Sequence, residues 1–129
     1  MNKLMKFTQL ISEENLSNII SKFGETHDTY EYMTGDCYAF AAALYSFMKK
    51  GNLYIATGEN GGEHAFYEFN NKFYDAYGEH KSKEDLISDA DIDMDGEVTF
   101  KKVSYEYMSK INKAEKLIAS LVDDFKSFK

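Results

Sequence analysis

The chain has 129 residues, of which 43% are hydrophobic and 16% aromatic, enough for one globular domain over residues 1–129 with its own core. The formal charge is −7 and all fifteen basic residues are lysine, so the guanidinium groups that grip phosphates and guanine edges are absent, and we expect no direct nucleic-acid binding. A single cysteine excludes an internal disulfide, and no apolar stretch is long enough for a signal peptide or a bilayer span, so we expect a cytoplasmic protein without membrane partners.

A first helix is predicted near the amino terminus. Thr8 or Ser12 can serve as its N-cap, and Gly24 is placed to end it. Its apolar residues recur at helical spacing: Leu10 or Ile11, Leu16, Ile19, Ile20 and Phe23.

A second helix is predicted after a loop over residues 25–35. It begins at Asp36 as N-cap, runs to about Lys50 and ends with Gly51 as the left-handed stop. The helix has an apolar stripe, so its first turn faces the core; the stripe consists of Cys37, Phe40, Ala41, Leu44, Phe47 and Met48.

Three strands are predicted next, over residues 53–57, 64–69 and 72–77. Asn70-Asn71 lies between the last two and tolerates the positive φ of a tight hairpin. With that two-residue loop, Asp75 and His64 become diagonal neighbours on one face, roughly 7–8 Å apart between Cα atoms, within reach of a carboxylate–imidazole contact. A slip of one residue would place them on opposite faces.

The remaining chain predicts a short helix over residues 82–87, a strand over 97–103 and a long closing helix from Ser104 to about Lys126. The order of elements gives an α+β fold: a small antiparallel β-sheet packed against a central helix that bears Cys37, with N- and C-terminal helices. The closing helix has an apolar stripe of Met108, Ile111, Ala114, Ile118, Leu121, Val122 and Phe125.

Cys37, His64 and Asp75 form the candidate catalytic set. Free amides and the positive end of the dipole in the first turn of a helix stabilise a thiolate. A strand histidine can take the thiol proton, and a carboxylate on the next strand can orient the imidazole. Each residue alone is common in ordinary cores and turns, so the order along the chain and the shared face carry this interpretation.

Three segments resemble the minimal core of papain-like and transglutaminase-like thiol enzymes, most of all small proteins of that kind carried by phages and other mobile elements. They cover roughly residues 36–78 and are Gly35-Asp36-Cys37-Tyr38-Ala39-Phe40-Ala41, Glu63-His64-Ala65-Phe66 and Phe73-Tyr74-Asp75-Ala76-Tyr77-Gly78.

The resemblance implies that Cys37 is the nucleophile, His64 the general base and later acid, and Asp75 the group that orients the imidazole. The substrate would be a peptide-like amide, the reaction that of a protease, a deamidase or a transglutaminase-like enzyme, and no cofactor is needed. A papain-type glutamine before the nucleophile is missing from this chain, which leaves Tyr32 and Thr34 as candidate second donors to an oxyanion beside the Cys37 amide.

Residues 91–98 match the first half of an EF-hand loop. Asp91, Asp93 and Asp95 stand at positions 1, 3 and 5 and Gly96 at position 6, but Lys102 replaces the glutamate that closes the calcium shell. We therefore expect an acidic turn before a strand, with weak calcium binding as the alternative. No Cys-x-x-Cys or His-Glu-x-x-His spacing predicts zinc.

A second functional hypothesis stays open beside the thiol enzyme. The chain can be a non-catalytic acidic interaction protein, such as a phage-type inhibitor of a host system, built on a degenerate thiol-enzyme scaffold, because an acidic surface can bind a basic protein patch. Both hypotheses require a peptide or protein as substrate or partner. The residues do not choose among hydrolysis, deamidation and acyl transfer, or among oligomeric states.

Overall fold

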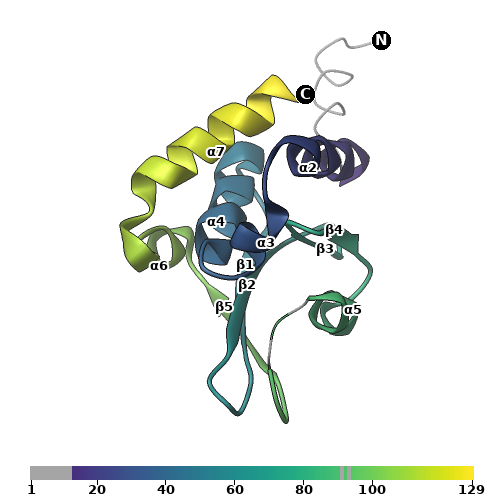
Figure 1. The fold of residues 1–129 in the computed structure, drawn as a ribbon, viewed down its shortest axis with the longest axis vertical. Helices are drawn as coiled ribbons and strands as arrows, with labels where there is room; N and C mark the ends of the chain where they lie inside the picture. Colours follow the sequence, from purple (N-terminus) through teal and green to yellow (C-terminus); the bar gives the residue numbers. More distant parts are fainter. Residues whose placement is uncertain (1–12, 91, 93) are drawn as a thin grey trace.

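The computed structural model describes residues 13–90, 92 and 94–129. Within them, five strands form an antiparallel sheet in the order β4-β3-β2-β1-β5 (Figure 1). The predicted α+β class with an antiparallel sheet is confirmed. In chain order the strands are β1 (Asn52–Thr57), β2 (Glu63–Phe69), β3 (Lys72–Asp75), β4 (Gly78–His80) and β5 (Thr99–Val103).

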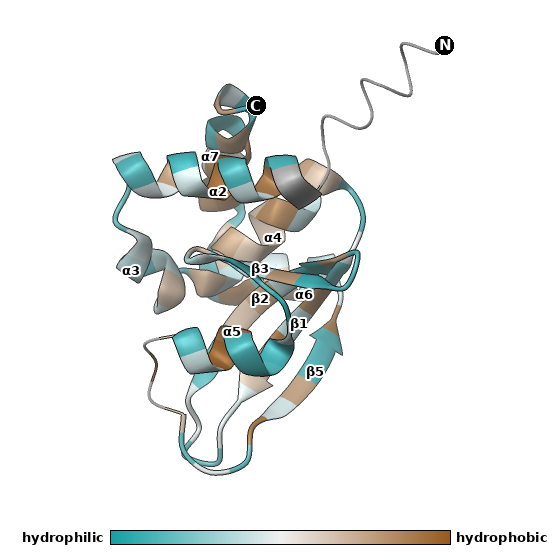
Figure 2. Ribbon diagram, turned by 90° about the vertical axis from the view of Figure 1, so that its right-hand side faces the viewer, coloured by the Kyte–Doolittle hydropathy of each residue, from teal (hydrophilic) through white to brown (hydrophobic). Residues whose placement is uncertain are grey.

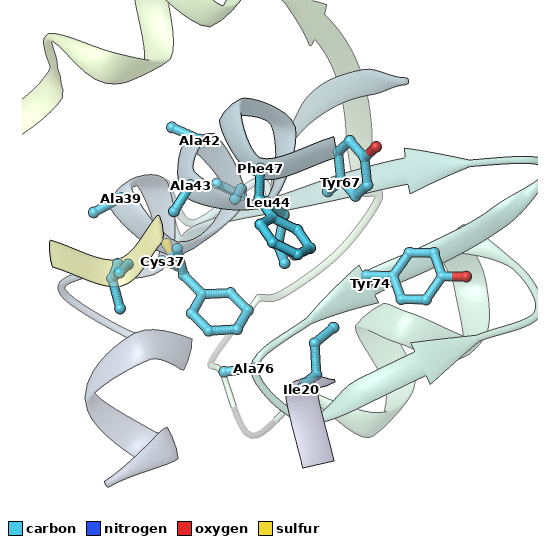
Figure 3. Packing of buried hydrophobic residues seen from close by; sticks show 14 of the residues in the cluster. Ile20, Cys37, Ala39, Ala42, Ala43, Leu44, Phe47, Tyr67, Tyr74 and Ala76 are labelled. Atoms are coloured by element: carbon cyan, nitrogen blue, oxygen red, sulfur yellow. The ribbon is translucent and has the colours of Figure 1, made fainter. Parts of the chain in front are cut away.

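One face of the sheet is covered by the helices that hold the main core. They are α2 (Glu13–Thr26), α4 (Cys37–Met48), α6 (Tyr105–Ser109) and α7 (Glu115–Ser127). Helix α4 is buried along most of its length because α7 packs on one side of it and β2 on the other. Small side chains permit this double packing: Ala39, Ala42 and Ala43, which Figure 3 labels, and Ala41.

The opposite face of the sheet is covered by one short helix, α5 (Lys83–Asp89), as Figure 2 shows. Its N-cap Ser82 accepts a hydrogen bond from the Asp85 N–H at 3.0 Å, which confirms the helix predicted there. A small apolar cluster of Ala56, Phe66 and Leu86 joins α5 to the sheet. No helix in the described part of the chain is both long and apolar enough to cross a bilayer.

The first helix ends later than predicted. Gly24 lies inside α2, and the helix ends at Thr26, where side chains contact the Phe23 carbonyl and no left-handed glycine is used. The Thr26 hydroxyl donates to the Phe23 carbonyl at 3.3 Å, and His27 Nδ1 lies 3.1 Å from the same oxygen. The predicted cap and first apolar residues lie outside the described residues: Thr8, Leu10, Ile11 and Ser12.

The predicted loop over residues 25–35 contains a short helix, α3 (Thr29–Met33). Asp28 is its N-cap and accepts a hydrogen bond from the Tyr30 N–H at 3.1 Å. Five residues are too few to show a helical period, so only the capping aspartate could have signalled this element.

The hairpin register is confirmed. Asn70 and Asn71 have φ of 54° and 63°, and Tyr67 pairs with Tyr74. The third predicted strand was too long, because β3 ends at Asp75, whose carboxylate accepts from the Tyr77 N–H at 2.9 Å and turns the chain into β4.

The single closing helix was wrong. Helix α6 ends at Ser109, a short 3-10 segment η1 (Ile111–Lys113) follows, and α7 begins at Glu115. The chain leaves the helical conformation at Asn112 and Lys113, whose φ of 58° and 53° are left-handed. An asparagine accepts that conformation more readily than most residues, but the apolar stripe runs across it and hides the interruption.

The predicted left-handed stop at Gly51 was wrong, because α4 ends at Met48 and another residue takes that conformation. Lys49, with φ of 64°, is the left-handed stop, and its N–H donates to the Tyr45 carbonyl at 2.6 Å. Gly51 has φ of 103°, and a Cβ there would lie 2.5 Å from the Glu68 carbonyl oxygen and 2.7 Å from the Tyr67 ring. Gly51 therefore allows the chain to pass close to β2.

Replacing Gly51 with alanine is expected to destabilise the protein by about 1–3 kcal/mol, because strain at positive φ adds to a clash with backbone. Gly61→Ala is the matched control, since Gly61 also has positive φ, 88°, but nothing lies within 4 Å of its Cβ position. Urea unfolding measures both. Equal losses in the two variants would contradict the close approach as the cause.

Candidate active site

Cys37 is the first residue of α4 and is 1% exposed. Its sulfur is surrounded by apolar side chains of the main core (Figure 3) and lies near the backbone N–H groups of Ala65, Tyr38 and Cys37 itself. Burial raises the pKa of the Cys37 thiol to about 11, and the three N–H groups offset that effect only in part. In this state the thiol is protonated at neutral pH.

A hydrogen bond crosses between the two elements that carry Cys37 and His64. The Tyr38 hydroxyl donates to Glu63 Oε1, so the residue after the cysteine is tied to the residue before the histidine. The negative charge of Glu63 also raises the pKa of the Cys37 thiol. This contact holds the amino end of α4 against the beginning of β2.

His64 and Asp75 meet as the hairpin register predicts. His64 Nε2 lies 3.0 Å from Asp75 Oδ2, and the side chains are 0% and 2% exposed. Burial alone would raise the pKa of Asp75, but hydrogen bonds and charge from His64 and His80 outweigh it and hold that pKa below its ordinary value. Asp75 is therefore ionised at neutral pH.

The ionised carboxylate decides which nitrogen of His64 carries the proton. Asp75 Oδ2 can only accept, so Nε2 carries the proton and donates it. When the ring is neutral, Nδ1 keeps its lone pair; Nδ1 is a buried atom with no hydrogen-bond partner among the described residues. A neutral imidazole with a free lone pair is the protonation state that a general base requires.

His80 is a third member of the cluster that the sequence analysis missed. Its Nε2 lies 3.1 Å from Asp75 Oδ1, and its Nδ1 lies 3.3 Å from Asp89 Oδ2 in α5. Gly78 was the available signal, because a tight turn there pairs Phe73 with His80 and places His80 on the face that carries Asp75.

The sulfur and the imidazole belong to opposite faces of β2. Ala65 and Tyr67 pack in the main core with Cys37, whereas Phe66 packs on the α5 face, and alternation along the strand places His64 with Phe66. The sulfur contacts the backbone N–H of Ala65, which lies in β2 before the residues of β2 that pair with β3. Within the described residues the structure brings His64 and Asp75 together, and His64 is not hydrogen-bonded to Cys37.

Of the two candidate oxyanion donors, Thr34 donates its hydroxyl elsewhere, and the ring of Tyr32 packs in the helical core. The Thr34 hydroxyl donates to the Tyr30 carbonyl at 3.1 Å. The Tyr32 ring packs against Phe23 and Phe40, with centroids 5.3 and 5.8 Å apart. Of the oxyanion donors proposed from the sequence, the backbone N–H of Cys37 therefore remains.

The acidic segment before β5 is described only in part. Asp91 and Asp93 lie outside the described residues, and the Asp95 N–H donates to the Asn60 side chain at 3.3 Å. A strand, β5, follows where an EF-hand would have its second helix. Among the described residues, no three His, Cys, Asp or Glu side chains are grouped so as to hold a metal ion.

A polar cleft of about 590 Å³ lies beside the turn that joins β3 and β4. Ser21 and Thr29 line it from the helical side, and Tyr77 and Glu79 line it from the turn. Cys37 and His64 are not among its lining residues, so this cleft does not open onto the sulfur.

Comparison with known proteins places the chain in a family. Neither curated proteins nor solved structures yield a match. A family model described as phage YunG-like protein matches residues 16–118, which is well over half of the chain and includes Cys37, His64, Asp75 and His80. This match confirms the phage-type part of the interpretation, while the thiol-enzyme part stays a prediction. The chain belongs to the phage YunG-like protein family.

Proposed function

We propose that this protein is a thiol hydrolase or acyltransferase that acts on a peptide-like amide. Cys37 is the nucleophile, His64 is the general base and later the acid, and Asp75 orients the imidazole. The observation that carries the proposal is the His64–Asp75 contact of 3.0 Å, because it leaves a buried, unpartnered Nδ1 lone pair on the strand that also contacts the Cys37 sulfur.

The chemistry follows from these roles. His64 Nδ1 takes the proton from Cys37 Sγ, and the sulfur attacks the carbonyl carbon of the substrate. His64 then gives the proton to the leaving amine, and the acyl group stays on the sulfur as a thioester. Water or an amine then attacks the thioester and loses its proton to His64, which returns it to the sulfur. Asp75 stays ionised and stabilises the imidazolium during both halves.

The proposed reaction needs a second conformation in which Sγ meets Nδ1. The Tyr38–Glu63 hydrogen bond ties the amino end of α4 to the beginning of β2, and these elements carry Cys37 and His64. The proposal requires this contact to break, so that the two elements can shift and the sulfur becomes accessible. Exposing the sulfur and moving it away from Glu63 removes the two causes of its high pKa, which are burial and the Glu63 charge.

A second candidate function has its own support. The sulfur is 1% exposed, and burial keeps its pKa near 11, as in a cysteine that serves only the core. With a net charge of −7, the scaffold then acts as a non-catalytic protein that binds a basic partner protein.

Iodoacetamide labelling of Cys37 across pH separates the two functions. Because the chain has one cysteine, the mass increase reports that thiol alone. The enzyme predicts rapid labelling below pH 7 that falls by roughly tenfold or more in His64→Ala, since an imidazole-paired thiol forms thiolate at lower pH.

His27→Ala is the matched control, because His27 is also hydrogen-bonded but lies at the end of α2, away from the candidate site. It should label at the rate of the unchanged protein. Slow labelling with an ordinary thiol pH profile, unaltered by His64→Ala, would support the interaction protein and reject the enzyme.

A further inference from the structure

We propose that His80 is a positioning residue, which together with Asp89 holds the Asp75 carboxylate so that one oxygen faces His64 Nε2. This inference rests on the proposed function, in which the oriented Asp75 carboxylate keeps His64 ready to use Nδ1 as a base.

The two oxygens of Asp75 have separate partners. Oδ2 lies 3.0 Å from His64 Nε2, while Oδ1 lies 3.1 Å from His80 Nε2 and accepts from the Tyr77 N–H at 2.9 Å. The carboxylate cannot rotate without losing contacts on both sides. Without His80, the Tyr77 N–H would be the one hydrogen-bond donor to Oδ1 that remains within the described part of the chain.

His80 is held at its other end by the helix on the same face of the sheet. Its Nδ1 lies 3.3 Å from Asp89 Oδ2, near the end of α5. The His80 side chain is 6% exposed, whereas that of Asp89 is 65% exposed. The cluster thus runs from the surface at Asp89 through His80 and Asp75 to the buried His64.

The charges agree with this arrangement. Burial alone would lower the pKa of His80, but the hydrogen bonds and charges of Asp75 and Asp89 outweigh it and raise that pKa. These carboxylates face His80 from β3 and from α5. A charged imidazolium donates from both nitrogens, so His80 bridges the two aspartates in one orientation.

A purely structural role predicts a different result. If His80 only attaches α5 to the sheet, its loss lowers stability but leaves the tautomer of His64 unchanged. If His80 positions Asp75, its loss loosens the contact that keeps the proton on His64 Nε2. The tautomer of His64 is therefore the decisive readout, and it can be measured without a substrate.

The experiment records ring-nitrogen NMR shifts of His64 at pH 7 in the full chain, with His80→Gln and Asp89→Asn as variants. The unchanged protein should show a protonated Nε2 and an unprotonated Nδ1. In His80→Gln the two shifts should move toward each other, and Cys37 labelling should slow severalfold. Asp89→Asn alters an exposed carboxylate, so it keeps the fold and should move the shifts in the same direction by less.

His27→Gln is the control, because His27 pairs with Asp124 at 3.3 Å outside this cluster and should leave the His64 shifts unchanged. Unchanged His64 shifts in both His80→Gln and Asp89→Asn overturn the positioning role, even if His64→Ala abolishes rapid labelling. Altered shifts together with labelling that ignores His64 support the positioning role and reject the enzyme, so the two failures are distinguishable.

Discussion

Replacing Phe125 with alanine is expected to lower the free energy of unfolding by about 3–5 kcal/mol, the range for deleting a buried aromatic ring. Phe125 is 0% exposed in α7, and its ring centroid lies 5.6 Å from Phe23, 5.4 Å from Phe40 and 5.9 Å from Phe47. The deletion opens a cavity where α2, α4 and α7 meet. Flanking α4 cannot close it, because its other side is packed on β2.

Urea unfolding measures this loss, with Phe128→Ala as the matched control. Phe128 is the same residue type at the end of the same helix, but it is only partly buried, so its loss should cost about 1 kcal/mol or less. A similar small loss for Phe125→Ala would contradict Phe125 as the centre of the helical core.

Asp75→Ala is expected to destabilise the protein by about 3–5 kcal/mol at neutral pH, because it leaves two buried imidazoles and the Tyr77 N–H without their acceptor. Asp124→Ala is the control. It also removes a carboxylate that pairs with a histidine, in this case His27. The His27 and Asp124 side chains are 29% and 38% exposed, and pairs at the surface contribute at most about 1 kcal/mol.

The difference between the unchanged protein and Asp75→Ala should depend on pH in a defined way. The lowered pKa of Asp75 means that its contribution is present above the ordinary value of 3.8 and is lost as pH falls through the lowered pKa. The raised pKa of His80 means that its contribution is complete below the ordinary value of 6.5 and is lost as pH rises through the raised pKa. Thermal unfolding should therefore show the largest difference between about pH 4 and pH 6.5. A difference that is the same at pH 5 and pH 9 would contradict the charged bridge.

Local patterns predicted much of this fold. The stripe from Cys37 to Met48 identified the central helix, and Asn70-Asn71 set the register that brings His64 to Asp75. Both signals are short in range, since a helical period and a two-residue turn are encoded by neighbouring residues. The break at Asn112 escaped the same reasoning, because the apolar stripe continues across it.

The candidate site also has features that local sequence predicts and features that depend on packing. The amino-acid pattern alone predicted the α+β class, the position of Cys37 in the first turn of α4 and the pairing of His64 with Asp75, because these follow from local periodicity and turn chemistry. The three-dimensional packing was needed to show that the sulfur is buried and protonated, that it packs on the face of β2 opposite to His64, and that His80 and Asp89 complete the cluster. Burial, pKa and the second partner of a carboxylate depend on groups distant in the chain, so neighbouring residues do not encode them.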